Sequence, residues 1–179
     1  MAYWLTVYCR RSVRGIDAAA LAAGLRGLDP AAPAGEDYQT LAERFDVDEA
    51  EVAPALAALT VVASAVGWEV RYRADPAARP LTIHVWSAPA QVAEELDEAR
   101  DCRNPPPLAE QLLGAVVEIV ALELGWSMLE DMGVVLADEA ARFLAQRGDG
   151  VVADDEARWR LVVDGAWHAL VDDDTAGRN

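Results

Sequence analysis

Two short stretches, Trp68-Glu-Val-Arg-Tyr-Arg73 and Leu81-Thr-Ile-His-Val-Trp86, alternate strictly between two sets of side chains. Such alternation is typical of β-strands that turn one face toward the core and the other toward solvent. Because a Pro-containing loop joins them, we expect an antiparallel hairpin, and one compatible register places Arg71 opposite His84. A slip of one residue would bury the charged set. The hairpin therefore predicts an antiparallel sheet with one polar face.

The chain before residue 104 adds one more strand and several helices to this hairpin. The β-branched and aromatic run from Tyr3 to Arg10 predicts a strand. Helix caps and apolar spacing predict four helices, at 17–26, 38–45, 48–59 and 89–100. Asn104-Pro-Pro-Pro107 then marks a boundary, because successive prolines disfavour helix before them. We therefore divide the chain into units 1–104 and 105–179, which we expect to pack as one body.

The second unit is expected to hold a helical hairpin followed by a β-meander. An apolar helix over 108–124 is predicted to lead into a second helix over 128–147, which Ser127 and Glu130 would cap. The meander follows from three strand-like segments, and Asp164-Gly165 is a strong turn signal between the last two. The expected fold class is therefore α+β: strand, helices, hairpin and helix around a small antiparallel sheet, then the helical hairpin and the meander.

Composition excludes several classes of function. The 179 residues carry a formal net charge of −16, with 31 acids against 15 bases, all of them Arg. A net charge of this sign argues against binding to a nucleic-acid backbone, which needs a basic field. Two cysteines make no disulfide framework, and the most apolar stretch, 112–124, is too short and too interrupted by acids to span a membrane. We expect a cytoplasmic protein without a membrane segment.

The charge is unevenly distributed, and this distribution carries our leading hypothesis. Residues 1–30 and 71–90 each have a small Arg surplus, so the helices hold nearly all the acid. We expect a non-enzymatic binding protein, in the manner of an immunity, antitoxin or regulatory protein, that engages a basic protein partner. The expected contact residues are acids of two helices: Glu49, Glu51, Glu94, Glu95 and Glu98. A second candidate patch on the hairpin's polar face comprises Arg71, Arg73, His84 and Trp86.

A transcriptional regulator is the first alternative. Residues 40–59 resemble a helix-turn-helix, with helix, short turn and second helix at the expected spacing and a β-hairpin after them. The resemblance covers about 20 residues. The second helix presents acids where base-reading side chains would lie, and residues 31–70 hold eight acids and one Arg.

A small-molecule sensor or enzyme is the second alternative. Glu123 and Glu139 fall inside the apolar stripes of the two predicted helices, which is unusual for carboxylates. Their expected separation along the helices is too large for a shared metal ion, so an ion pair with Arg is the other interpretation. No phosphate loop, dinucleotide fingerprint or nucleophile motif accompanies them. The sequence therefore predicts no cofactor and no metal, and it leaves the oligomeric state open.

Overall fold

The computed structural model describes residues 2–30, 32 and 35–171. Across these residues the chain forms an eight-stranded antiparallel sheet in the order β2-β3-β4-β5-β1-β6-β7-β8. The strands are β1 (Ala2–Cys9), β2 (Thr60–Ala63), β3 (Gly67–Arg71), β4 (Leu81–Trp86), β5 (Glu118–Gly125), β6 (Gly150–Asp154), β7 (Trp159–Val163) and β8 (Ala166–Leu170). The expected α+β class and the C-terminal meander are confirmed.

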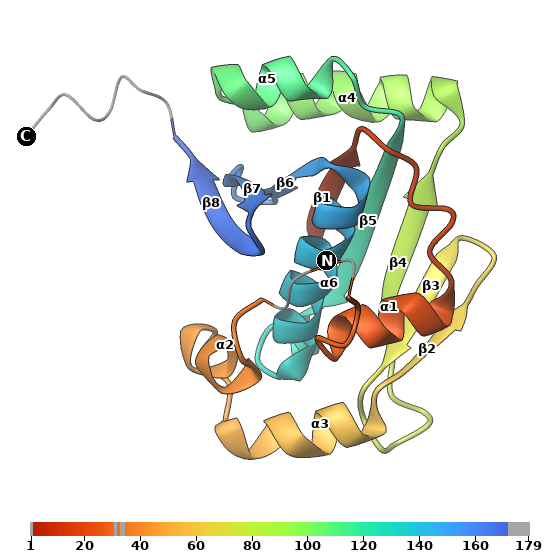
Figure 1. Cartoon of the computed structure of the whole chain (residues 1–179), viewed down its shortest axis with the longest axis vertical. Helices are drawn as coiled ribbons and strands as arrows, with labels where there is room; N and C mark the ends of the chain where they lie inside the picture. The colour runs from red at the N-terminus through yellow and green to blue at the C-terminus, as the bar shows by residue number, and fades with distance from the viewer. Residues whose placement is uncertain (1, 31, 33–34, 172–179) are drawn as a thin grey trace, which may run out of the picture.

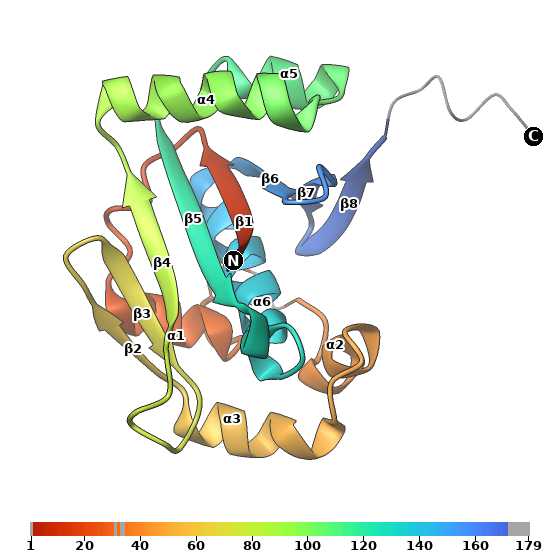
Figure 2. The same ribbon diagram turned by 180° about the vertical axis from the view of Figure 1, so that it is seen from behind.

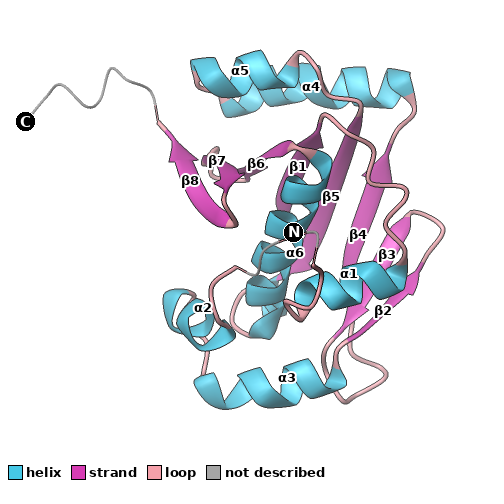
Figure 3. Ribbon diagram, in the orientation of Figure 1, coloured by secondary structure: helices cyan, strands magenta, loops and turns pink. Residues whose placement is uncertain are grey.

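Helices connect the strands and cover parts of both faces of the sheet (Figure 3). They are α1 (Ala18–Leu25), α2 (Tyr38–Arg44), α3 (Val52–Ala58), α4 (Pro89–Arg103), α5 (Pro107–Leu113) and α6 (Met132–Gly148), with short 3-10 helices η1 (Glu49–Glu51) and η2 (Trp126–Met128). Asp17 caps α1 as expected, accepting a hydrogen bond of 2.7 Å from the Ala20 amide. The capping role predicted for Ser127 is wrong, because α6 begins later and Asp131 is its cap.

The predicted helix over 108–124 is also wrong in its second half. Helix α5 ends at Leu113, and Glu118–Gly125 is the strand β5, paired with β1 on one side and β4 on the other. Side chains on both faces of β5 are buried, so the strand reads as a continuous apolar run that periodicity cannot distinguish from a buried helix. The helical hairpin is therefore replaced by a short helix, a central strand and one long helix.

The main core lies between α6 and one face of the sheet. Leu5 and Val7 of β1, with Val120 and Leu122 of β5, are fully or almost fully buried in this core. In Figure 1 helix α6 runs in front of β1 and β5, and α1 and α2 lie beside it. We call this the covered face. Strand β1 lies between β5 and β6, so the sheet contains strands from both sides of Asn104.

The opposite face is covered only at one end by the helices that the structure describes. There α4 and α5 pack a second core, whose members include Tyr8, Ile119, Val151 and Trp159 from the strands. Figure 2 shows α4 lying across the ends of β4 and β5, with the remainder of these strands uncovered by a helix. The fold thus leaves one surface of a central sheet accessible.

The register of the hairpin differs from the expected one. Glu69 lies opposite Thr82 and Gly67 opposite His84, instead of Arg71 opposite His84. The shift is an even number of residues, so each side chain keeps the face that alternation predicts. The predicted Asp164-Gly165 turn is present, and both residues have positive φ, 50° and 84°. Such a turn matches the twist of the strands that it connects.

Candidate functional site

The uncovered part of the sheet presents aromatic and ionisable side chains from three adjacent strands. Strand pairing places Trp4 opposite Glu123, and Glu123 opposite Thr82. Directly opposed residues point to the same face of a sheet, so these side chains share the face away from α6. We define the open face as Trp4 of β1, Glu123 of β5, His84 and Trp86 of β4, and Arg79 from the loop before β4.

An aromatic row crosses this open face. The His84 ring lies between two indoles, with centroids 5.7 Å from Trp4 and 6.3 Å from Trp86. All three side chains are half-buried. Beneath them lie small side chains, Thr6 and Ala121, which are only 4% and 1% exposed. The result is a supported aromatic surface on strands, which is more rigid than a surface built from loops.

Glu123 carries the charge of the open face, and it is held by two neighbours. Arg79 Nη2 donates to Glu123 Oε1, and His84 Nε2 lies 3.4 Å from Glu123 Oε2. The Glu123 side chain is 21% exposed and Arg79 is 57% exposed. Glu123 thus pairs with an arginine, as one interpretation of the sequence expected, but the pair is partly exposed instead of buried. Because Glu123 lies on strand β5, its predicted placement within a helix is wrong.

Glu139 lies on the other side of the sheet, so the two acids do not form one site. It is on α6, where Arg142 donates to both of its carboxylate oxygens, from Nε at 2.7 Å and from Nη2 at 2.6 Å. Both side chains are at most 5% exposed. Burial raises the pKa of Glu139 above its ordinary value of 4.5, and Arg142 opposes this shift. The predicted pair Glu123 and Glu139 is thus separated, with each acid paired to its own arginine.

Helix α4 crosses the sheet at one end of the open face and carries three acids, Glu94, Glu95 and Glu98, which we call the acidic ledge. Val92 and Ala99 of α4 pack in the core over the sheet, which fixes this helix in place. Within the described part of the chain, no cation forms an ion pair with any of the three acids. Burial, and then the charges of Glu98 and Glu94, raises the pKa of the half-buried Glu95. The charge of Arg103 opposes this shift but does not cancel it, so repulsion among like charges dominates at the acidic ledge.

The other two acids predicted to contact a partner lie at the far end of the molecule. Glu49 and Glu51 form the 3-10 helix η1 before α3, and both are exposed. Figure 1 shows α3 and α4 at opposite ends of the sheet. A small partner that contacts the acidic ledge would not reach Glu49 and Glu51. In the helix-turn-helix-like segment the same exposed acids occupy the start of the second helix.

The predicted patch of Arg71, Arg73, His84 and Trp86 is only partly assembled. Arg71 follows Glu69 on β3 and pairs with it at 3.0 Å, on the same face as His84. Arg73 instead donates from Nε to Asp131 Oδ2 at 3.0 Å and from Nη2 to the Ser127 carbonyl at 3.2 Å. It therefore anchors the start of α6, which corrects its predicted place on the hairpin face. Trp4 was not predicted as a site residue, although the alternation along β1 indicates that it lies on the opposite face of the strand from Leu5.

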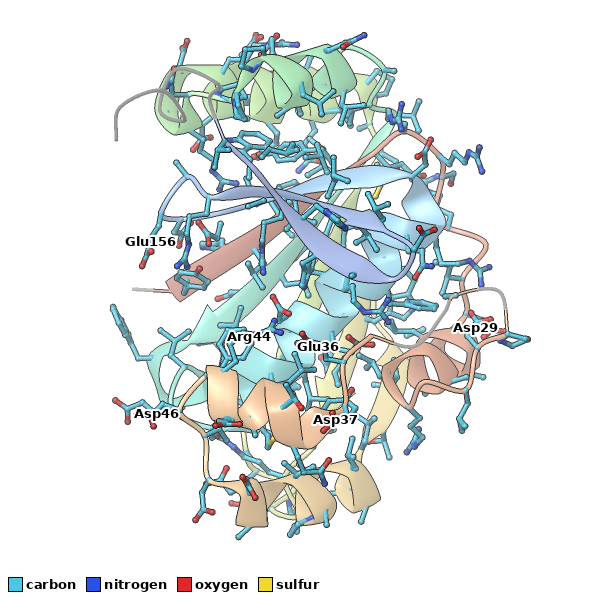
Figure 4. All side chains as sticks on the ribbon, turned by 60° about the vertical axis from the view of Figure 1, so that its left-hand side comes forward. Asp29, Glu36, Asp37, Arg44, Asp46 and Glu156 are labelled. Atoms are coloured by element: carbon cyan, nitrogen blue, oxygen red, sulfur yellow. The ribbon has the colours of Figure 1, made fainter. Side chains whose placement is uncertain are left out.

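A second concave region lies between α2, α6 and the β6–β8 meander. A cleft of about 370 Å³ there is lined by three arginines, among other residues. Each of the three is paired with a carboxylate: Arg44 with Glu36, Arg158 with Asp154, and Arg160 with Asp138. Figure 4 places Arg44 and Glu36 close together beside α2. Arg160 and Asp138 join β7 to α6, and the other two pairs are local, so the charges of this cleft are already neutralised and the open face remains the better candidate.

Neither a metal-binding cluster nor a membrane-spanning helix is found in the described part of the chain. Among residues 2–30, 32 and 35–171, no three His, Cys, Asp or Glu side chains are placed to hold a metal ion. Within the same residues, no helix has the length and apolar character needed to cross a membrane. Comparisons with protein-family models, with curated proteins and with solved structures find no match to this chain.

Proposed function

We propose that this chain is a non-enzymatic binding protein that neutralises or regulates a cationic protein partner, as immunity and antitoxin proteins do. The contact surface combines the open face with the acidic ledge of α4. The observation that carries this proposal is a half-buried Trp4–His84–Trp86 row on a sheet face that is crossed at one end by α4, whose three ledge carboxylates form no ion pair among the described residues. Aromatic side chains of this kind supply most of the binding energy at protein interfaces.

The acidic ledge supports a basic partner rather than an acidic one. Burial and mutual repulsion already raise the pKa of Glu95, so a cation placed at the ledge would relieve that repulsion. The net charge of −16 adds a long-range field that accelerates the approach of a cationic surface. Complementary charge at the rim of an interface acts mainly on the association rate.

The open face supports a contact with protein rather than with a small molecule. It is a surface of strands on which the side chains of Trp4, His84 and Trp86 are half-buried. Its ion pair of Glu123 with Arg79, and the adjacent pair of Arg71 with Glu69 on β3, are partly exposed and can exchange partners at low cost. A rigid aromatic centre with adaptable charges around it is the common anatomy of an interface.

The test asks whether the product of the adjacent gene is a basic protein and measures its binding to this chain at low and at high salt. Changing Glu94, Glu95 and Glu98 together to Gln should slow association by about tenfold or more at low salt and flatten its salt dependence. Trp4→Ala should instead weaken the equilibrium affinity, by about 30-fold, because it removes a central contact.

The matched control is the double variant Glu49→Gln, Glu51→Gln, which removes similar charges at the opposite end of the molecule. It should leave association nearly unchanged. Equal effects of the control and of the acidic-ledge variant would show that only net charge matters and would overturn the proposed surface. Binding that does not depend on salt would overturn the electrostatic part. A complex with duplex DNA at low salt would favour the helix-turn-helix alternative instead.

A further inference from the structure

The β2 edge of the sheet has little of the protection that edge strands usually have: α1 packs beside β2, and Arg26 donates to the Leu59 carbonyl just before the strand. Strand β2 is the first in the sheet order, so among the described residues only β3 pairs with it. The ten residues from Leu59 to Trp68 include no charged side chain and no proline. Val62 and Val66 are 45% and 46% exposed. Natural edge strands are normally blunted by charges, prolines or bulges, so an apolar and uncharged edge favours pairing with another strand.

The free backbone groups of this edge can be assigned from the ladder. The Ser64 amide donates to the Gly67 carbonyl at 2.9 Å, which makes these two residues a hydrogen-bonded pair. Hydrogen-bonded pairs alternate along an antiparallel ladder. Val61 and Ala63 therefore turn their amide and carbonyl groups away from β3. Within the described residues, no backbone hydrogen bond from outside the β2–β3 ladder reaches either residue.

The opposite edge of the sheet is different. Strand β8 ends at Leu170, and the sequence continues after Val171 with Asp172-Asp173-Asp174. Three consecutive carboxylates directly after an edge strand oppose its pairing with another copy of an acidic chain. A contact between β2 of one copy and β8 of the next would be head-to-tail and would not close.

We propose that β2 is a dimerisation edge, on which β2 of a second copy of this chain pairs antiparallel about a two-fold axis. An exposed strand edge is complementary to another strand edge, because every free amide faces a free carbonyl. Two chains of charge −16 repel each other, so a contact between them is favoured where the chain is uncharged. A two-fold contact of β2 with itself satisfies both conditions and closes after two copies.

The neighbouring surface can extend this contact. A cleft of about 360 Å³ beside the edge is lined mostly by apolar residues such as Val66 and Val85, together with two charged residues, Arg14 and Asp17. A four-residue ladder alone buries less than the roughly 1,200 Å² typical of stable interfaces. The dimer should therefore be weak and concentration-dependent. High salt should tighten it by screening the repulsion, whereas the proposed binding to a cationic partner should weaken in high salt. This opposite salt dependence keeps the two proposals separable.

The test is sedimentation of the full chain from about 1 to about 200 µM, at low and high salt. The wild-type protein should shift from its monomer mass of 19.2 kDa toward twice that mass, and more so in high salt. Val62→Lys should raise the dissociation constant by about tenfold or more, because the two lysines would face each other across the axis. Ala63→Pro removes an outward amide and should do the same without adding charge.

The matched control is Val163→Lys, because Val163 is similarly exposed, at 42%, but lies on the inner strand β7. This variant should dimerise as the wild type does, and circular dichroism should show that all variants are folded. A wild-type protein that stays monomeric throughout overturns the proposal. So does a dimer that survives both β2 variants, or one that Val163→Lys disrupts equally.

Discussion

The two faces of the central sheet use the same chemical pair, a glutamate with an arginine, in opposite ways. On the covered face Glu139 and Arg142 are at most 5% exposed, whereas on the open face Glu123 is 21% and Arg79 is 57% exposed. Water screens the second pair and is excluded from the first. A buried pair is therefore costly to break, while a pair near the surface can be rearranged with little loss. The ion pair on the covered face therefore helps to specify the structure, whereas the charged side chains on the open face remain available for contact with a partner.

The buried pair belongs to a wider network that joins the meander to α6. Asp138 accepts from Arg160 at 2.8 Å and from Trp167 Nε1 at 2.9 Å, and the Arg160 guanidinium lies 4.3 Å from the Trp167 ring centroid. Arg142 also donates to the Gly165 carbonyl in the β7–β8 turn. Helix α6 therefore positions β7 and β8 through directional bonds as well as through apolar packing.

The largest expected effect comes from breaking the buried pair on one side. Arg142→Met would leave the Glu139 carboxylate buried without its main partner, and the free energy of unfolding should fall by about 3–5 kcal/mol. Urea denaturation measures this loss. In the double variant with Glu139→Leu most of the stability should return, because no uncompensated charge remains. A single variant as stable as the wild type would contradict the comparison between the two faces.

A much smaller effect is expected from the equivalent change on the open face. Arg79→Met removes the partner of Glu123, but Glu123 keeps contact with water and with His84. The free energy of unfolding should therefore fall by less than about 1 kcal/mol in the same urea experiment. A loss comparable to that of Arg142→Met would mean that Glu123 has a structural role, and the open face would not be an adaptable surface.

The difference between the faces was only partly visible in the sequence. Alternation within the hairpin correctly assigned His84 and Trp86 to the polar face, because an even shift in register preserves parity. The position of Glu123 was predicted wrongly, because its segment was assigned to a helix. Strand β5 is buried on both faces, so its centre shows no alternation of polar and apolar residues. The β-branched run from Val116 to Val120, just after Gly114, was the signal for a strand there.

The candidate site could not be assembled from local patterns, because it depends on long-range strand order. Trp4 and Glu123 are neighbours only because β1 pairs with β5. The helix that carries the acidic ledge lies at one end of the open face only because α4 crosses the end of the sheet (Figure 2). Nothing local in the sequence distinguishes Glu94 and Glu98 from Glu49 and Glu51, which lie at the far end. The charge pattern predicted which helices present acidic surfaces. The topology of the sheet decided which of these helices lies at the end that bears the aromatic row.

The smallest expected effect sharpens the account of the acidic ledge. The pKa of Glu95 is raised by burial and by its acidic neighbours, so the folded chain holds this proton to a higher pH than the unfolded chain does. The contribution of Glu95 to stability is therefore complete below its ordinary pKa of 4.5 and declines as the pH rises through the raised value. Glu98→Gln removes one repulsive neighbour and should increase the free energy of unfolding at neutral pH by about 0.2–0.5 kcal/mol. This gain should vanish in urea experiments at pH values low enough to protonate the carboxylates. A gain that persists in acid would come from side-chain packing rather than charge, and the ledge would then have no stored repulsion for a cationic partner to relieve.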